Sequence, residues 1–290
     1  MNRAIPFLFL AVGSVVPAAV DALDRELDAL GARSEVLYLR TGEEVRRLCP
    51  GFEGVMGGIY WLRAVQYYGS QRAFSEEKRY DNLGPLIEIT NALDPRLELA
   101  YRYGALFLAE PWPAGPGKPD EGVRVLERGI RNLPGSWRLR WDLGGLYYFF
   151  LKDSRRAADV LIEGSKVPGA PFWLESLAAS MLGKGGHRDV AREIWKRQYE
   201  HAAEDAIRDN ALHHIQLLDA LDAVDALNEA SRRFAERSGR PPRAPSDLVE
   251  AGLVGRVPVD PSGLPFAYDA ETGRFSIARG SKFWRPRYDE

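Results

Sequence analysis

The stretch 137–168, WRLRWDLGGLYYFFLKDSRRAADVLIEGSKVP, contains the pattern that decides the fold. Aromatic residues and a pair of glycines fill its first half, alanine and leucine recur in its second half, and a proline ends it. The first half has counterparts 40 and 80 residues earlier (141 − 101 and 141 − 61), which indicates an internal repeat. The matched columns are Trp61, Tyr101 and Trp141; Ala64, Gly104 and Gly144; Tyr67, Phe107 and Tyr147; and Tyr68, Leu108 and Tyr148.

A second stretch with apolar residues at helical spacing follows each of these aromatic stretches. The second stretches are residues 83–93, 122–133 and 157–167, and they end near Pro95, Pro134 and Pro168. Because proline cannot continue a helix interior, it marks the end of each pair of helices. A fourth pair is expected from Pro171 to about His201. The sequence therefore predicts about four helical hairpins, in which the Ala and Gly column allows neighbouring helices to approach closely.

This pattern resembles the tetratricopeptide repeat family, whose units are helical hairpins of about 34 residues. The residues that match directly are Gly144, Tyr147, Ala157 and Pro168, and those that match around an insertion are Gly104, Phe107, Gly122 and Pro134. The insertion, residues 110–117 (EPWPAGPG), predicts a non-helical loop, with a counterpart at about 69–78. The resemblance covers about 54–203 and implies an all-α solenoid of about four repeats, whose stacked hairpins bury their apolar faces jointly.

Two further parts are expected after the repeats. Residues 204–238 place apolar side chains along one stripe at helical spacing, which predicts a long capping helix that ends at Gly239. The rest, residues 239–290, is expected to form a small β-hairpin module and a tail. Its expected elements are a short helix at 247–251 capped by Ser246, and strands at 266–268 and 274–277 joined by a loop at 269–273.

Part of this module, residues 239–277, resembles the C-terminal region of the major pseudopilins of type II secretion. The matching strings are GRPP at 239–242 and DPSGLPF at 260–266, followed by Tyr268. The resemblance implies a protein of the bacterial envelope that assists pilus or secretion-system assembly. The long hydrophobic assembly helix of a pseudopilin is not in its usual relation to this segment, so the chain is not expected to be a pilin subunit. The alternative, which we prefer, is a small hairpin that only caps the solenoid.

The N-terminal residues 1–22 have the character of a signal peptide or an N-terminal membrane anchor. A basic start at Arg3 precedes an apolar run at 4–20, and acidic residues follow from Asp21. This order favours export, so we expect the bulk of the chain to face the periplasm, with residues 4–20 either removed as a signal or held in the inner membrane. A cytoplasmic protein with a buried N-terminal helix is the alternative. Residues 23–53 are then a linker or an N-terminal cap.

Composition excludes several classes of function. The chain has 290 residues and a formal net charge of −2, without the basic excess of a nucleic-acid-binding protein. Its one cysteine, Cys49, excludes an internal disulfide and a thiolate metal cluster. The string GPGK at 115–118 lacks the first glycine and the Ser or Thr of a phosphate-binding loop. No cofactor, metal or nucleic-acid partner is therefore expected.

The preferred hypothesis is a non-enzymatic scaffold that binds a protein or peptide in a concave groove. The family resemblance implies that the first helices line this groove. Tyr and Trp are suitable interface anchors because they bury a large area and keep a polar tip. The partner-binding candidates are Trp61, Tyr101 and Trp141 in one column and Tyr68, Leu108 and Tyr148 in another. Packing between helices as core is an equal alternative for each of them.

Two other functions stay open at this point. One is an enzyme whose site is framed by the solenoid and uses His201, Asp205 and His213, although no recognised catalytic or zinc-binding string accompanies them. The other is a purely structural subunit of a multiprotein complex. An enzyme predicts a deep polar pocket with convergent titratable groups, whereas a structural subunit predicts a large apolar patch on the convex side.

Overall fold

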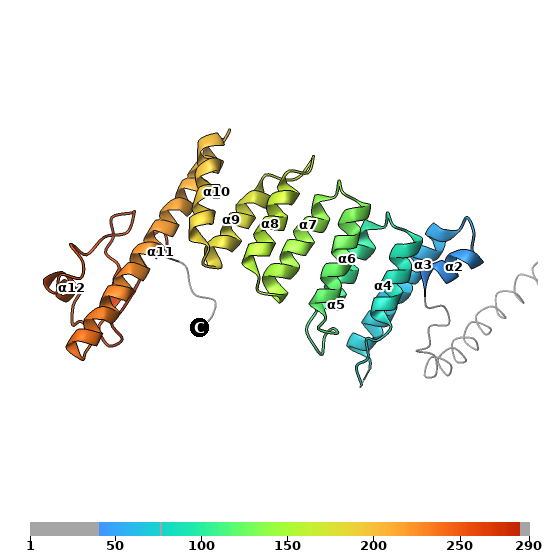
Figure 1. Ribbon diagram of the computed structural model, residues 1–290, viewed down its shortest axis with the longest axis horizontal. Coiled ribbons are helices and arrows are strands. Elements are labelled where there is room, and N and C mark those ends of the chain that lie inside the picture. Colours follow the sequence, from blue (N-terminus) through green and yellow to red (C-terminus); the bar gives the residue numbers. More distant parts are fainter. Residues whose placement is uncertain (1–40, 76, 285–290) are drawn as a thin grey trace, which may run out of the picture. The chain divides into compact units, whose positions relative to one another are not determined.

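The computed structural model of the protein describes residues 41–75 and 77–284. Within these residues the chain is mostly helical, with 11 α-helices and a two-stranded antiparallel sheet near the C-terminus. The chain divides into two compact units between Leu146 and Tyr147. Figure 1 labels the helices α2 to α12 along the ribbon. The predictions of a helical chain and of a small C-terminal hairpin are confirmed.

The first unit consists of successive helices whose neighbours in sequence pack together. Its helices are α2 (Gly42–Leu48), α3 (Glu53–Ala73), α4 (Leu83–Leu93), α5 (Glu98–Ala109), α6 (Pro119–Asn132) and α7 (Trp137–Gly145). Helix α3 packs on α4, α5 packs on α6, and α5 also contacts both α3 and α7. The first two predicted hairpins therefore form, and α4 has the predicted bounds.

Small residues permit close helix contacts in this unit, and one of them, Gly104, belongs to the predicted column of small residues. A Cβ atom at Gly104 of α5 would lie 3.0 Å from the nearest carbon of Ile87 on α4. A Cβ atom at Gly129 of α6 would lie 2.8 Å from the ring of Tyr101 on α5. Interiors are close-packed, so a larger residue at Gly129 would clash with the Tyr101 ring, and one at Gly104 would require the Ile87 side chain to shift.

The second unit begins within a π-helical turn, Leu146–Phe150, and contains the remaining elements. These are α8 (Ser154–Ser165), α9 (Trp173–Lys184), α10 (Arg188–His201), α11 (Asp205–Ser238), α12 (Ser246–Glu250), β1 (Ala267–Asp269) and β2 (Arg274–Ser276). Helix α9 packs against α8 and α10, and α10 packs against α11. The predicted fourth hairpin corresponds to α9 and α10, and the long capping helix corresponds to α11.

Charged side chains hold α10 against α11. Arg188 of α10 pairs with Asp222 and Asp225, and Arg192 pairs with Asp219 and Asp222. Burial alone would raise the pKa of Asp222, but hydrogen bonds from Arg192 and Arg188 outweigh it and lower that pKa. The charge network thus links the first half of α10 to α11.

The C-terminal module packs on the second half of α11. Its core joins Leu248, Phe266 and Phe275 to Leu227 and Phe234 of the helix. The side chain of Asn228 accepts a hydrogen bond from the backbone N–H of Phe275 (2.7 Å) and donates one to the Phe275 carbonyl (3.1 Å). A helix side chain thus makes both backbone hydrogen bonds of a strand residue, and this contact fixes the hairpin on α11.

Some predicted boundaries are wrong. Helix α3 continues through residues 69–73, which were expected to form a loop. This segment contains no proline, and Gln71 within it is buried and accepts a hydrogen bond from the backbone N–H of Arg79. Ser246 is the first residue of α12 and makes no capping bond, since Pro245 precedes the helix as its N-cap. Both strands differ from their predicted bounds, with β1 starting one residue later and β2 ending one residue earlier. The loop at 110–117 is non-helical, as predicted.

The predicted signal peptide or anchor, residues 1–22, lies outside the described residues, as does the first part of the predicted linker 23–53. Helix α2 occupies the end of that linker and packs on α4. Across residues 41–75 and 77–284, no helix combines the length and the apolar character needed to cross a membrane.

Candidate functional site

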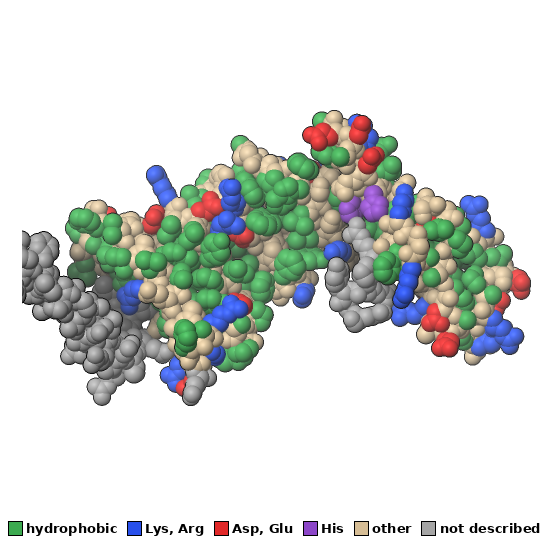
Figure 2. Space-filling model, turned by 180° about the vertical axis from the view of Figure 1, so that it is seen from behind, with side chains coloured by type: hydrophobic (Ala, Val, Ile, Leu, Met, Phe, Trp, Pro, Cys, Tyr) green, Lys and Arg blue, Asp and Glu red, His purple; other side chains and the backbone are tan. Residues whose placement is uncertain are grey.

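The first unit exposes a row of large apolar side chains on three neighbouring helices. We call this surface the α3/α5/α7 face. Its residues are Val55, Ile59, Leu62 and Val65 of α3, Leu99, Tyr103 and Leu106 of α5, and Trp141 of α7. Hydrophobic side chains are spread over this unit in the view of Figure 2. Several large apolar side chains exposed on neighbouring helices are typical of a protein-interaction site.

The face arises from the helical period of α3 and α5. On α3, Val55, Ile59 and Leu62 follow one another at intervals of four and three residues, which places them on one side of the helix. The opposite side is buried against α4 and α5. Leu62 is 60% exposed and Val55 is 62% exposed. The helix is therefore apolar on two sides, although packing within the described residues buries only one of them.

Four of the six predicted partner-binding residues belong to the core. Trp61, Tyr68, Tyr101 and Leu108 are all buried. The ring of Phe107 on α5 stacks with Tyr68 at a centroid distance of 4.1 Å and with Trp61 at 6.0 Å. Trp61 and Tyr68 of α3 pack on α5, and Tyr101 of α5 packs on α6. Because all four residues are buried, their placement on an open groove is corrected.

The other two predicted residues, Trp141 and Tyr148, reach the surface. Trp141 is 39% exposed and belongs to the first unit, whereas Tyr148 is half-buried and belongs to the second. The two columns are therefore not two parallel rows on one surface. Of the six candidates, the α3/α5/α7 face includes only Trp141.

The next column of the repeat, one residue later, contains Leu62, Arg102 and Asp142. Leu62 is 60% exposed, whereas the side chains of Arg102 and Asp142 are only 24% and 22% exposed. Arg102 of α5 forms an ion pair with Asp142 of α7, and its guanidinium carbon lies 6.0 Å from the centre of the Trp141 ring. Burial raises the pKa of Asp142, and the Arg102 hydrogen bond partly opposes this shift. The pair joins α5 to α7 next to Trp141.

A second polar cluster lies at the C-terminal end of α3. The hydroxyl of Tyr68 donates a hydrogen bond to Glu110, and Arg72 donates to both the Tyr68 oxygen and Glu110 at 2.9 Å. Burial and the hydrogen bond to Glu110 raise the pKa of Tyr68 to about 12. The cluster links α3 to the loop after α5, and its role is structural.

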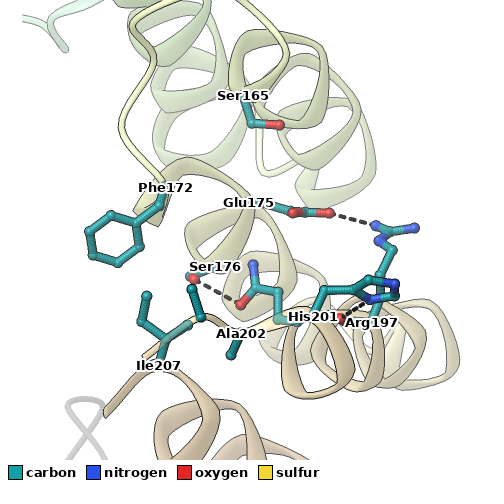
Figure 3. Close-up of a pocket in the computed structure, with 10 residues that line it drawn as sticks. Ser165, Phe172, Glu175, Ser176, Arg197, His201, Ala202 and Ile207 are labelled. Carbon is teal, nitrogen blue, oxygen red and sulfur yellow. Dashed lines mark hydrogen bonds and ion pairs between the residues drawn. The ribbon is translucent and has the colours of Figure 1, made fainter. Parts of the chain in front are cut away.

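The second unit contains a pocket of about 430 Å³ between the start of α9, the end of α10 and the start of α11. Figure 3 shows Phe172, Ala202 and Ile207 toward one side of it, and Glu175, Arg197 and His201 toward the other. Arg197 donates a hydrogen bond to Glu175, at 2.5 Å, so the two formal charges neutralise each other. The pocket thus has an apolar side and a polar side without net charge.

The residues of the enzymatic alternative do not form one site. His201 lies at the pocket and contacts the carbonyl of Arg197 through Nδ1, at 2.8 Å. Asp205 pairs with Arg208, and the ring of His213 stacks on Phe283. In the part of the chain that the structure describes, no three His, Cys, Asp or Glu side chains are grouped so that they could hold a metal ion.

Comparisons with protein-family models, with curated proteins and with solved structures found no match for this chain. The tetratricopeptide and pseudopilin resemblances therefore stay predictions. The candidate site is defined by the geometry of the chain itself, through the α3/α5/α7 face of the first unit and the pocket of the second.

Proposed function

We propose that this protein is a non-enzymatic scaffold that binds a segment of another protein on the α3/α5/α7 face. The observation that supports the proposal is the set of exposed apolar side chains on α3 and α5, where Leu62 is 60% exposed and Tyr103 is 46% exposed. Burial of such side chains by a partner supplies binding free energy in proportion to the apolar area removed from water.

The proposal includes a tetratricopeptide-like solenoid. In this arrangement α3, α5 and α7 are the first helices of successive repeats, and their outer sides line the inner surface of the array. The contacts of α5 with both α3 and α7 agree with such stacking. The partner segment then runs across the three helices, with its apolar side chains on Leu62 and Leu106 and a polar group near the Arg102–Asp142 pair.

The proposal also keeps the location expected from the sequence. The basic start, the apolar run at 4–20 and the acidic residues after it favour a protein exported across, or anchored in, the bacterial inner membrane. The partner would then be a periplasmic protein, and the pseudopilin resemblance points to pilus or secretion-system assembly.

Capture of cross-linked partners tests the proposal. The test variant combines Leu62→Ser, Leu99→Ser and Leu106→Ser, all on exposed positions of the face. The matched control combines Arg124→Ser, Glu127→Ser and Arg131→Ser, on exposed positions of α6. We expect one defined partner to be captured by wild type and by the control, and to be reduced at least about tenfold with the test variant. Equal capture by both variants would reject the face as the binding site.

A further inference from the structure

The pocket of the second unit is a second candidate binding site, in addition to the α3/α5/α7 face. It is lined by residues of four helices and the link before α11, and its volume of about 430 Å³ lies in the range of ligand sites, roughly 300–1,000 Å³. All of its lining residues belong to the second unit, so it is a site separate from the α3/α5/α7 face.

The charges of the pocket cancel within the pocket. Glu175 and Arg197 form an ion pair, with side chains that are 28% and 56% exposed. His201 must donate its Nδ1 hydrogen to the Arg197 carbonyl, because a carbonyl oxygen only accepts. A neutral His201 therefore keeps a hydrogen on Nδ1 and presents Nε2 as an acceptor. Because the charges of Glu175 and Arg197 already neutralise each other, an anionic or cationic ligand would have to compete with this ion pair. The pocket therefore favours a ligand without net charge.

The polar side of the pocket offers hydrogen bonds that suit a peptide group. Ser176 donates to the side-chain oxygen of Gln198 at 3.0 Å. With its oxygen engaged, the amide of Gln198 has its two N–H donors to offer a ligand. A backbone carbonyl accepts such a hydrogen bond without bringing a charge.

The apolar side offers contact area for a side chain. Phe172 precedes α9 and is 70% exposed, although its ring is large and apolar. Ala202, Ala203 and Ile207 line the pocket with it. A ligand with a bulky apolar group would remove the Phe172 ring from water, and this burial favours binding.

We propose that this pocket binds a neutral peptide residue with a bulky apolar side chain, presented by a protein partner. The side chain lies on Phe172 and Ile207, and the adjoining backbone carbonyl accepts a hydrogen bond from Gln198. The site is independent of the proposed face, and a protein that binds there need not be the partner of the face.

The test titrates the full-length protein with three probes and follows the methyl signals of Ala202, Ala203 and Ile207 by NMR. The probes are the neutral blocked peptide acetyl-Ala-Phe-Ala-amide, the anion acetyl-Ala-Phe with a free carboxylate, and the cation phenylalanine amide. We expect saturable shifts of these methyl signals with the neutral probe and binding at least about tenfold weaker for both charged probes.

Two variants and a control complete the test. Phe172→Ala is expected to weaken binding of the neutral probe about tenfold, because apolar contact area is lost. Gln198→Leu is expected to weaken it about fivefold, because one hydrogen bond is lost. The control is Phe74→Ala, which removes a phenylalanine that is 86% exposed and lies outside the pocket lining. The proposal is overturned if the pocket signals do not shift, if a charged probe binds more tightly than the neutral one, or if Phe172→Ala has no more effect than Phe74→Ala.

Discussion

Tyr101→Ala tests whether the aromatic column is core, and its effect can be worked out from the structure. Tyr101 is fully buried on α5, and α6 approaches its ring at Gly129. Its hydroxyl accepts a hydrogen bond from Asn132 at 2.7 Å. Removal of a buried aromatic side chain typically costs about 3–5 kcal/mol, because a cavity stays behind. We expect Tyr101→Ala to lower the free energy of unfolding by this amount.

Two further substitutions separate the contributions. Tyr101→Phe keeps the ring and loses only the hydrogen bond, which costs about 1 kcal/mol. Leu62→Ala changes a side chain that is 60% exposed on the α3/α5/α7 face, so its effect on folding should stay within about 0.5 kcal/mol. The expected order of destabilisation is therefore Tyr101→Ala, then Tyr101→Phe, then Leu62→Ala.

Urea unfolding followed by helical circular dichroism measures these differences as shifts of the transition midpoint at a common slope. The reasoning is refuted if Tyr101→Ala destabilises the protein no more than Leu62→Ala does. That result would mean that the Tyr101 ring is dispensable for packing and that the column belongs to a binding surface after all.

Three further predictions concern single side chains. Asn91 is 2% exposed and its amide has no hydrogen-bond partner among the described residues. We therefore expect Asn91→Ala to raise the free energy of unfolding by about 1 kcal/mol. A lower free energy of unfolding, measured in urea, would contradict this expectation. Because folding raises the pKa of Tyr68 from 10.0 to about 12, its contribution to stability is complete below about pH 10 and is lost as the pH rises through 12. Tyr68→Phe should remove this step from a plot of unfolding free energy against pH, and an unchanged plot would show that Tyr68 is not the titrating group. Asn228→Ala should cost about 1–3 kcal/mol and increase amide hydrogen exchange at Phe275, whereas unchanged exchange would show that Asn228 does not hold the hairpin.

The helices could be predicted from the sequence because strong local signals mark their ends. Residues 83–93 are apolar at helical spacing and precede Pro95, and they form α4. Gly239 ends α11 in a left-handed conformation with a φ of 70°, which glycine adopts without strain. Where such a signal is weak, as at residues 69–73, burial of Gln71 decided the outcome and the expected loop became helix.

The exposed residues of the α3/α5/α7 face could be predicted only in part from the sequence. The repeat placed Trp61, Tyr101 and Trp141 in one column, yet they are 9%, 0% and 39% exposed. A sequence period aligns equivalent positions, but the rotation of each helix against its neighbours decides which side faces water. The next column gives no clearer signal, because Leu62 is 60% exposed whereas the side chains of Arg102 and Asp142 are 24% and 22% exposed.

The pocket of the second unit had no signal in the sequence. Its lining extends from Ser165 to Ile207 and comes from several elements. Of these residues only His201 was singled out, and for a metal or catalytic role that does not need Phe172 or Gln198. Tertiary packing of α9, α10 and α11 brings these side chains together.

Site-specific photo-cross-linking tests the central claim, binding through the α3/α5/α7 face, most directly. A photoreactive phenylalanine analogue would replace Leu62 or Tyr103 on the face, or Arg124 on exposed α6 as the control, in the full-length protein in its native cells. We predict that Leu62 and Tyr103 form cross-links to the same partner protein and that Arg124 forms none to it. Cross-links to that partner from Arg124 but not from Leu62 or Tyr103 would contradict the account and place the binding surface on the opposite helices.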